Sequence, residues 1–257
     1  MTNAAMDVRI YVIPGSHPCE AVMAAARHKG IAFKKVIVLP VMHKFQMKLM
    51  FGKSTVPAMK ADGQKVSGSI NILRTLEALQ PEPTIFPSDP QQLETVMRAA
   101  TWSDGDLQDM GRRLVWSQLS REPSELFNFS AGEKLPVPKF MAQPMAKPTA
   151  MIAAHYNDAG DQNVRTDIAK LPALLDEIDA LIATGVIGAA QPNFADFLVL
   201  SSVALWLTME DFRPAIEQRP CGKLAARVFP DYPGHIKSGI LPQEWLAPLG
   251  DITPVTV

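Results

Sequence analysis

The chain has only two cysteines, no hydrophobic run long enough to cross a membrane, and almost no net charge. Cys19 and Cys221 are too few for the disulfide framework of a small secreted domain. The longest apolar run, Phe194 to Met209, contains Asp196 and is shorter than the roughly 20 residues that span a bilayer. The 25 Lys and Arg side chains nearly balance 26 Asp and Glu side chains, and no dense basic block indicates nucleic-acid binding. We therefore expect neither a membrane nor a nucleic acid as a partner.

The amino terminus and the histidines lack recognisable signals as well. Met1 to Asp7 has no charged segment followed by an apolar one, so we expect no secretory leader, and a reducing cytoplasm fits best. The five histidines have no spacing with cysteines or acids typical of a metal cage or a catalytic triad, so we expect no metal. The 257 residues, 47% of them hydrophobic, suffice for one large domain or two modest ones, and we expect two.

The first 80 residues alternate between strand and helix patterns. A β-rich run from Val8 to Ile13 is stopped by Pro14 and Gly15. Apolar residues then recur at helical spacing from Cys19 to His28, and a second β-rich run follows from Val36 to Leu39. Since a strand-helix-strand crossover is right-handed and joins parallel strands, the first two strands are predicted to pair in parallel.

A second helix, a hairpin and a third helix follow along the chain. Met42 to Phe51 can form a short helix, and Asp62-Gly63 between two short β-rich runs is typical of a tight hairpin turn. The next helix begins at Ser69 and ends before Pro81. The predicted order of elements over residues 8–79 is therefore βαβαββα.

Residues 81–90 contain four prolines, which indicates a stiff connector rather than a helix. Beyond it the periodicity is helical, with clear signals at Leu171 to Ile182 and at Phe194 to Met209. Asn193 is expected to cap the latter helix, with Asp196 reaching back to the cap N–H. We therefore predict an α/β domain over residues 1–80, a proline-rich linker over 81–90 and an all-α domain over 91–257.

Two segments of the second half have no regular pattern. Between Arg121 and Thr149 the chain is rich in Pro and Met, so no helix is predicted through it. This segment is a lid, a dimer contact or a loose insertion, and the sequence leaves the three open. The tail after Pro220 is expected to be irregular too.

The segment Ser16-His17-Pro18-Cys19 joins the first strand to the first helix. It places a hydroxyl and a thiol at the positive end of a helix, where free backbone N–H groups and the helix dipole favour an anion. A thiolate bound there would be stabilised, and Ser16 could donate a hydrogen bond to it. The pattern therefore favours thiol chemistry.

In the order of its motifs the chain resembles the cytosolic glutathione S-transferase family, of the serine or cysteine type. The resemblance is carried by VRIYVIPGSHPC at the first strand and helix, TVPAM before the hairpin, SGSINILRTLE at the third helix and QPNFADFLVL in the second domain. It implies a thioredoxin-like N-terminal domain followed by an all-α C-terminal domain, with glutathione as co-substrate. It also implies a homodimer and a role in detoxification.

The resemblance implies a role for several motif residues. Pro57 would follow a cis peptide bond that exposes the Val56 backbone to the cysteinyl part of glutathione. Ser69 would bind the γ-glutamyl carboxylate at a helix start, and His43 the glycyl carboxylate. Gly68 is a departure, because most relatives have an acid there that holds the γ-glutamyl ammonium. This departure weakens the expectation of ordinary glutathione affinity and leaves open a different low-molecular-weight thiol or an acid from elsewhere.

Three residues near the first helix each allow two interpretations. Ser16 either activates the bound thiol by donating to its sulfur or only caps the helix, and its position and the resemblance favour activation. Cys19 is expected in the core, as free cysteines usually are, although exposure would lower its pKa and allow a redox role. Tyr11 is expected to be structural, since it is one residue out of register with the tyrosine that some transferase classes use.

The predicted function is a glutathione S-transferase-like enzyme that activates a small thiol for attack on an apolar electrophile. Met and aromatic side chains near Trp102 to Trp116 could line the pocket of that electrophile. An alternative enzyme is a glutathione-dependent reductase, ether-cleaving or dehalogenating. An alternative from another class is a non-catalytic binding or interaction protein with the same fold, suggested by Gly68 and by the segment from Arg121 to Thr149.

Overall fold

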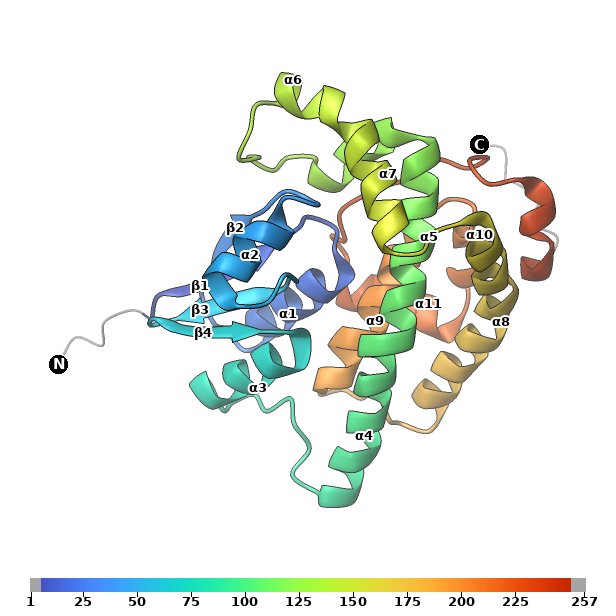
Figure 1. The fold of residues 1–257 in the computed structure, drawn as a ribbon. Coiled ribbons are helices and arrows are strands. Elements are labelled where there is room, and N and C mark those ends of the chain that lie inside the picture. The colour runs from blue at the N-terminus through green and yellow to red at the C-terminus, as the bar shows by residue number, and fades with distance from the viewer. Residues whose placement is uncertain (1–5, 251–257) are drawn as a thin grey trace.

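The N-terminal domain is built on a four-stranded mixed sheet (Figure 1). The computed structural model describes residues 6–250, apart from the side chain of Lys139. Two of the expectations fall partly outside this range. The expected absence of a leader concerns residues 1–5, and the expected helical domain includes residues 251–257. The strands are β1 (Val8–Val12), β2 (Lys34–Ile37), β3 (Ala58–Ala61) and β4 (Gln64–Ser67). They lie in the order β2-β1-β3-β4, with β1 parallel to β2, as predicted, and the other pairs antiparallel.

The element order βαβαββα over residues 8–79 is confirmed. The helices of this domain are α1 (His17–His28), α2 (His43–Phe51) and α3 (Ser69–Leu79). The turn between β3 and β4 lies at Asp62 and Gly63, whose φ angles of 44° and 90° are both positive, as a type I′ turn requires. Strand β2 lies two residues earlier than the apolar run that predicted it.

Helices make up most of the rest of the chain. They are α4 (Pro90–Trp102), α5 (Gln108–Arg121), α6 (Lys139–Ala142), α7 (Ala146–Tyr156), α8 (Asp161–Ala183), α9 (Phe194–Leu207), α10 (Arg213–Ile216) and α11 (Pro220–Val228). Helices α4 and α5 follow one another as a long column through the centre of Figure 1. A π-helical segment, Ser103–Leu107, joins them, and there the Gln108 N–H donates to the Ser103 carbonyl, five residues back.

Two expectations for irregular segments are wrong. Helix α6 lies inside the segment that was expected to have no helix, α7 begins inside it, and α11 occupies the first nine residues of the tail that starts at Pro220. Helices α7 and α11 each have a proline within the first turn, Pro148 in α7 and Pro220 in α11, where the missing N–H costs no helical hydrogen bond. The prolines that indicated loops therefore mark helix starts. Between α5 and α6 the chain forms a 3₁₀ segment, Pro123–Ser130.

Helix α1 is buried on almost every side. Nine of its twelve residues are buried, and its alanines at positions 21, 25 and 26 are inaccessible to solvent. It packs against α3 within its own domain and against α9 of the helical part. Because alanines let the neighbouring helices approach closely, one hydrophobic cluster extends from the sheet through α1 into α9. The start of α1 is thereby held between the two parts of the chain.

The linker between the two parts is packed on both sides. Ile85 is 1% exposed and its carbonyl accepts a hydrogen bond from the Phe194 N–H at 2.9 Å. The ring of Phe86 stacks on that of Phe194, with centroids 4.2 Å apart. The predicted capping box is also present at this end of α9: Asn193 accepts from the Ala195 N–H, and Asp196 accepts from the Asn193 N–H.

The Lys29 ammonium is buried at the junction of α1, α3 and the linker. It donates to Glu77 Oε2 at 2.6 Å and to the Pro83 carbonyl at 2.8 Å. The Lys29 side chain is inaccessible to solvent and that of Glu77 is 22% exposed. A buried cation needs such partners, so this cluster fixes the start of the linker.

Within residues 6–250, none of the helices combines the length and the apolar character that crossing a bilayer requires.

We predict that Glu77→Gln lowers the free energy of unfolding by about 2 to 3 kcal/mol, because it leaves the buried Lys29 ammonium without its counter-ion; a fully buried pair would cost more. Urea unfolding measures this, with Glu94→Gln as the control, since the Glu94 side chain is 73% exposed and its substitution should cost little. Burial alone would raise the pKa of Glu77, but hydrogen bonds from Lys29, Thr84 and the Ile85 N–H hold it below the ordinary value of 4.5. The stabilisation is therefore present in full above pH 4.5 and is lost as the pH falls below it, where the difference between variant and wild type should shrink. A difference that persists unchanged to low pH would contradict this account.

Candidate functional site

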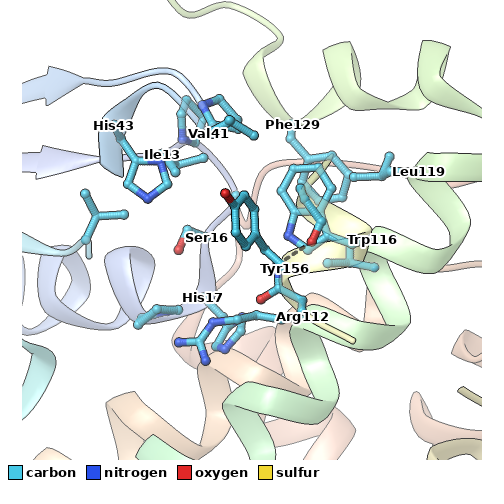
Figure 2. A pocket seen from close by; sticks show the side chains of 18 of the residues that line it. Ile13, Ser16, His17, Val41, His43, Arg112, Trp116, Leu119, Phe129 and Tyr156 are labelled. Carbon is cyan, nitrogen blue, oxygen red and sulfur yellow. Dashed lines mark hydrogen bonds between the residues drawn. The ribbon is translucent and has the colours of Figure 1, made fainter. Parts of the chain in front are cut away.

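A cavity of about 320 Å³ lies at the start of α1, between the sheet domain and the helical part. One wall of the cavity comes from the N-terminal domain, namely from the loops before α1, α2 and β3. The opposite wall comes from helices α5 and α7. Figure 2 shows Ser16, His43, Arg112 and Tyr156 around this space. Three residues named from the sequence, Ser16, His43 and Val56, are therefore brought together in one lining.

Ser16 occupies the cap position of α1 without acting as a side-chain cap. Its backbone is extended, with φ −74° and ψ 112°, and its hydroxyl makes no capping hydrogen bond to the helix. It is half-buried and lines the cavity. Of the two roles that the sequence left open for the Ser16 hydroxyl, helix capping is therefore not the one it has in the structure.

The start of α1 offers fewer free N–H groups than the sequence analysis expected. Pro18 has none, and the N–H groups of Cys19 and Glu20 both donate to the Ser16 carbonyl, at 2.8 and 2.9 Å. Stabilisation of an anion here depends on the helix dipole and on the Ser16 side chain, rather than on a row of unpaired amides.

The peptide bond between Val56 and Pro57 is cis, as the resemblance implies. Val56 lines the cavity, and Pro57 is buried behind it. The Gly68 N–H donates to the Pro57 carbonyl at 3.2 Å, which places the start of α3 directly beside this bond. Gly68 and Ser69 do not belong to the cavity lining, however, and Ser69 is only 3% exposed.

Cys19 lies in the core, as expected, and is inaccessible to solvent. Burial raises the pKa of its thiol to about 12, against the opposing effect of hydrogen bonds from Ser16 and the Ile13 backbone. Cys221, on α11, is buried as well, and its pKa is also raised to about 12, mainly by burial. Neither thiol has the exposed, ionised character of a reactive cysteine.

His43 contributes a neutral imidazole rather than a positive charge. Burial, with the nearby charge of Lys44, lowers the pKa of His43 below its ordinary value of 6.5. The positive charge comes from Lys44, whose ammonium lies 3.6 Å from the ring centroid of Tyr156 on α7. This cation–π contact joins the two walls of the cavity across its mouth. Tyr156 is 60% exposed and was not identified from the sequence.

Arg112, on α5, is a second lining residue that the sequence analysis missed. Its guanidinium bonds Asp109 at 2.9 Å and also Gln108. Arg112, Val115, Trp116 and Leu119 line the cavity at helical spacing, so they share one face of α5. A lone arginine on an otherwise apolar helix face is the signal that could have identified it.

A second, apolar cavity of about 290 Å³ adjoins the first. The two share Ile13, Val41 and Phe129 in their linings, and the second continues toward the methionines of α6 and the segment after it. Trp116 lines the first cavity, in agreement with the predicted Trp102 to Trp116 region, but Trp102 faces a separate groove along α4.

The titratable side chains between residues 6 and 250 include no group of three or more His, Cys, Asp or Glu residues that could hold a metal ion.

Residues 10–84 match the family described as "Glutathione S-transferase, N-terminal domain". No curated protein matches the sequence at a significant level. Among similar solved structures is a glutathione S-transferase from Rhodospirillum rubrum F11, which is 17% identical with a TM-score of 0.54 over 94% of this chain and 99% of that one. Another is a maleylacetoacetate isomerase from Anaeromyxobacter dehalogenans 2CP-1 with bound glutathione, 18% identical with a TM-score of 0.53 over 98% of each chain. A theta class glutathione S-transferase from Xanthomonas axonopodis pv. citri, also with glutathione bound, is 14% identical with a TM-score of 0.52 over 91% of this chain and 99% of that one. These likenesses show the fold.

We predict that iodoacetamide at pH 8 modifies neither Cys19 nor Cys221 in the native protein. With both pKa values raised to about 12, the thiolate fraction at pH 8 is on the order of one in ten thousand. Mass spectrometry of the alkylated protein measures this, and the same treatment in guanidinium chloride, where both sites should react, is the control. Rapid labelling of Cys19 in the native state would contradict its burial.

Proposed function

Because residues 10–84 carry the N-terminal domain of the glutathione S-transferase family, we propose that the protein binds glutathione in the main cavity and activates its thiol for attack on an electrophile. In this reaction the thiol loses its proton to solvent and the sulfur forms a bond to carbon. Any leaving group departs with its bonding electron pair. The observation that carries the proposal is the half-buried Ser16 hydroxyl, which makes no capping hydrogen bond and lies in the lining of a cavity that also contains Val56. Its hydrogen bond would turn from the Cys19 thiol to the bound sulfur.

The helix dipole and Ser16 act on the same atom in this proposal. A thiol sulfur placed beside Ser16 would lie at the positive end of α1, where a negative charge is favoured. A hydrogen bond from the hydroxyl to the sulfur would stabilise the thiolate further and raise the fraction available for attack. The thiol of the ligand escapes the burial that keeps Cys19 protonated, because the cavity is open to solvent.

The polar ends of glutathione have candidate partners on both sides of the sulfur. The Val56 backbone, beside the cis bond, would pair with the cysteinyl part. Lys44 would attract the glycyl carboxylate, and the neutral His43 would add a hydrogen bond. The bound glutathione in the isomerase and theta class crystals supports this choice of thiol. The adjoining apolar cavity would hold the body of the electrophile.

A non-catalytic binding protein is the second candidate, and one observation favours it. Gly68 stands where an acid is usual in the family, and neither Gly68 nor Ser69 lines the cavity. The γ-glutamyl ammonium then lacks its expected acid, and Ser69 would reach the γ-glutamyl carboxylate only from beyond the cavity lining. Binding of glutathione decides between the two candidates.

We also propose that the protein is a cytoplasmic homodimer. Leu93, Met97 and Trp102 line a shallow groove on the outer face of α4, and each is only half-buried. A second copy covering this groove would complete their burial. The molar mass in solution, from light scattering, tests this part of the proposal.

We predict that Ser16→Ala raises the pKa of bound glutathione by at least about one unit and lowers kcat/KM by about 10 to 100 fold, because a hydrogen bond to the thiolate is lost. The ultraviolet absorbance of the thiolate, followed against pH, measures the ionisation. Ser16→Thr, which keeps the hydroxyl, is the matched control and should preserve most of the activity. Unchanged ionisation in Ser16→Ala would refute the role of Ser16.

We predict that calorimetry detects glutathione binding to the wild type, and that Ser69→Ala weakens it by about 5 to 20 fold without changing the pKa of the bound thiol. The reason is that Ser69 would contact a carboxylate far from the sulfur. Ser67→Ala, at the end of β4, is the control for a local change of the same size. Absence of heat with wild-type protein, together with no competition by S-methylglutathione, would favour the non-catalytic candidate.

A further inference from the structure

The charged side chains that line the main cavity all have the same sign. Among the described residues of its lining, Lys44 and Arg112 are cations, and none is Asp or Glu. The Lys44 ammonium lies against the ring of Tyr156 on α7. Figure 2 shows Arg112 of α5 beside His17. The cavity therefore attracts anions, and its two cations belong to different walls.

Arg112 has hydrogen-bonding capacity to spare. A guanidinium has five N–H donors, and the bonds to Asp109 and Gln108 use one on each terminal nitrogen. The side chain of Asp109 is 61% exposed and that of Arg112 is 34% exposed, so solvent screens this ion pair. Gln108 is buried, at 3% exposure, but its bond uses only one N–H of Arg112, so the remaining N–H groups can bind a further anion.

His17 lies next to Arg112 and has an unsatisfied ring nitrogen. It is 2% exposed, and its Nε2 is buried without a hydrogen-bond partner among the described residues. Burial, and then the charge of Arg112, lowers the pKa of His17 well below its ordinary value, so the ring is neutral. A neutral imidazole carries one N–H, which at Nε2 would donate to an anionic oxygen. Buried polar atoms rarely lack partners, so this atom points to a ligand.

The absence of a side chain at Gly111 of α5 leaves room for the His17 ring beside Arg112. Gly111 precedes Arg112, and a Cβ at this glycine would lie 3.2 Å from Cε1 of His17 and 3.4 Å from a methyl group of Leu205. Only a residue without a side chain allows this spacing without a shift of the imidazole. The position of the His17 ring therefore depends on Gly111.

We propose that Arg112 and His17 form a subsite for a carboxylate on the electrophilic co-substrate. The inference rests on the proposed function, because it assigns the class of the second substrate at the same site. Val115, Trp116 and Leu119 continue the same face of α5 with apolar surface, so the ligand that fits has an aromatic or other apolar body and one acidic group. Arg112 would bind the carboxylate with two parallel hydrogen bonds.

Binding of an acidic and a neutral probe without any thiol tests the subsite directly. Calorimetry of the full chain should show that 3,5-dinitrobenzoate binds at least about ten-fold more tightly than 3,5-dinitrobenzamide, since only the former carries a carboxylate. Arg112→Gln should abolish this preference. Arg112→Lys keeps the charge and should retain part of the preference for the acidic probe. This variant is the control that the fold tolerates substitution at position 112. Arg98→Gln, which removes an exposed arginine of α4 outside the cavity, should leave the preference unchanged. Equal affinities in the wild type, no binding of either probe, or a preference that survives Arg112→Gln would overturn the proposal.

A turnover assay distinguishes failure of the subsite from failure of the proposed function. With glutathione and 4-chloro-3,5-dinitrobenzoate, the thiolate forms a C–S bond, the C–Cl bond breaks and chloride leaves with the electron pair, while the thiol proton passes to solvent. Arg112→Gln should lower kcat/KM for this acid about ten-fold and for the corresponding benzamide less than about two-fold. Equal losses for both, with a raised pKa of the bound thiol, would show that Arg112 acts on the sulfur and would overturn the subsite. No turnover of either compound, with the binding preference intact, would reject the proposed function and leave the subsite standing.

Discussion

The burial of α1 is the constraint on which the candidate site depends. A helix that is covered by α3 on one side and by α9 on the other cannot move relative to either part of the chain. Its first residues therefore emerge where the sheet domain and the helical part meet, and there the cavity forms. The buried Lys29 ammonium secures the other end of the same helix by binding Glu77 and the linker carbonyls. One helix thus sets both the path of the linker and the position of Ser16.

The pKa of the Cys19 thiol shows which electrostatic effect dominates at the start of α1. Cys19 lies within the first turn, where the helix dipole lowers a thiol pKa, yet burial raises the pKa of Cys19 from 9.0 to about 12. Dipole effects at a helix end are worth about 0.3 to 1 kcal/mol, whereas this rise corresponds to about 4 kcal/mol. Desolvation therefore decides the outcome for a buried thiol. A ligand sulfur in the open cavity would avoid that cost and keep the benefit of the dipole.

The sequence predicted correctly those features that depend only on a few consecutive residues. The turn at Asp62-Gly63 and the capping box of Asn193 and Asp196 are of this kind, because each depends on a few consecutive residues. Pro148 and Pro220 misled the same reasoning, since a proline in a first turn and a proline in a loop look alike in sequence. Lys44 and Tyr156 could not be assigned, because their contact arises only when α2 and α7 meet across the cavity, whereas Arg112 could have been noticed as the lone arginine on an apolar face of α5.

The buried stripe of α4 continues into α5 across the π-helical segment that joins the two helices. Its buried members follow one another at intervals of three or four residues on both sides of Ser103–Leu107, so the register of the stripe is kept. Beyond that point the buried stripe continues through Met110 and Leu114 toward the core, while Arg112 turns to the cavity. In the proposed function, the N-terminal domain would provide the surface for a thiol at its loops around Ser16 and Val56. The choice of its reaction partner would fall, in the same proposal, to the face of α5 that carries Arg112, Val115, Trp116 and Leu119.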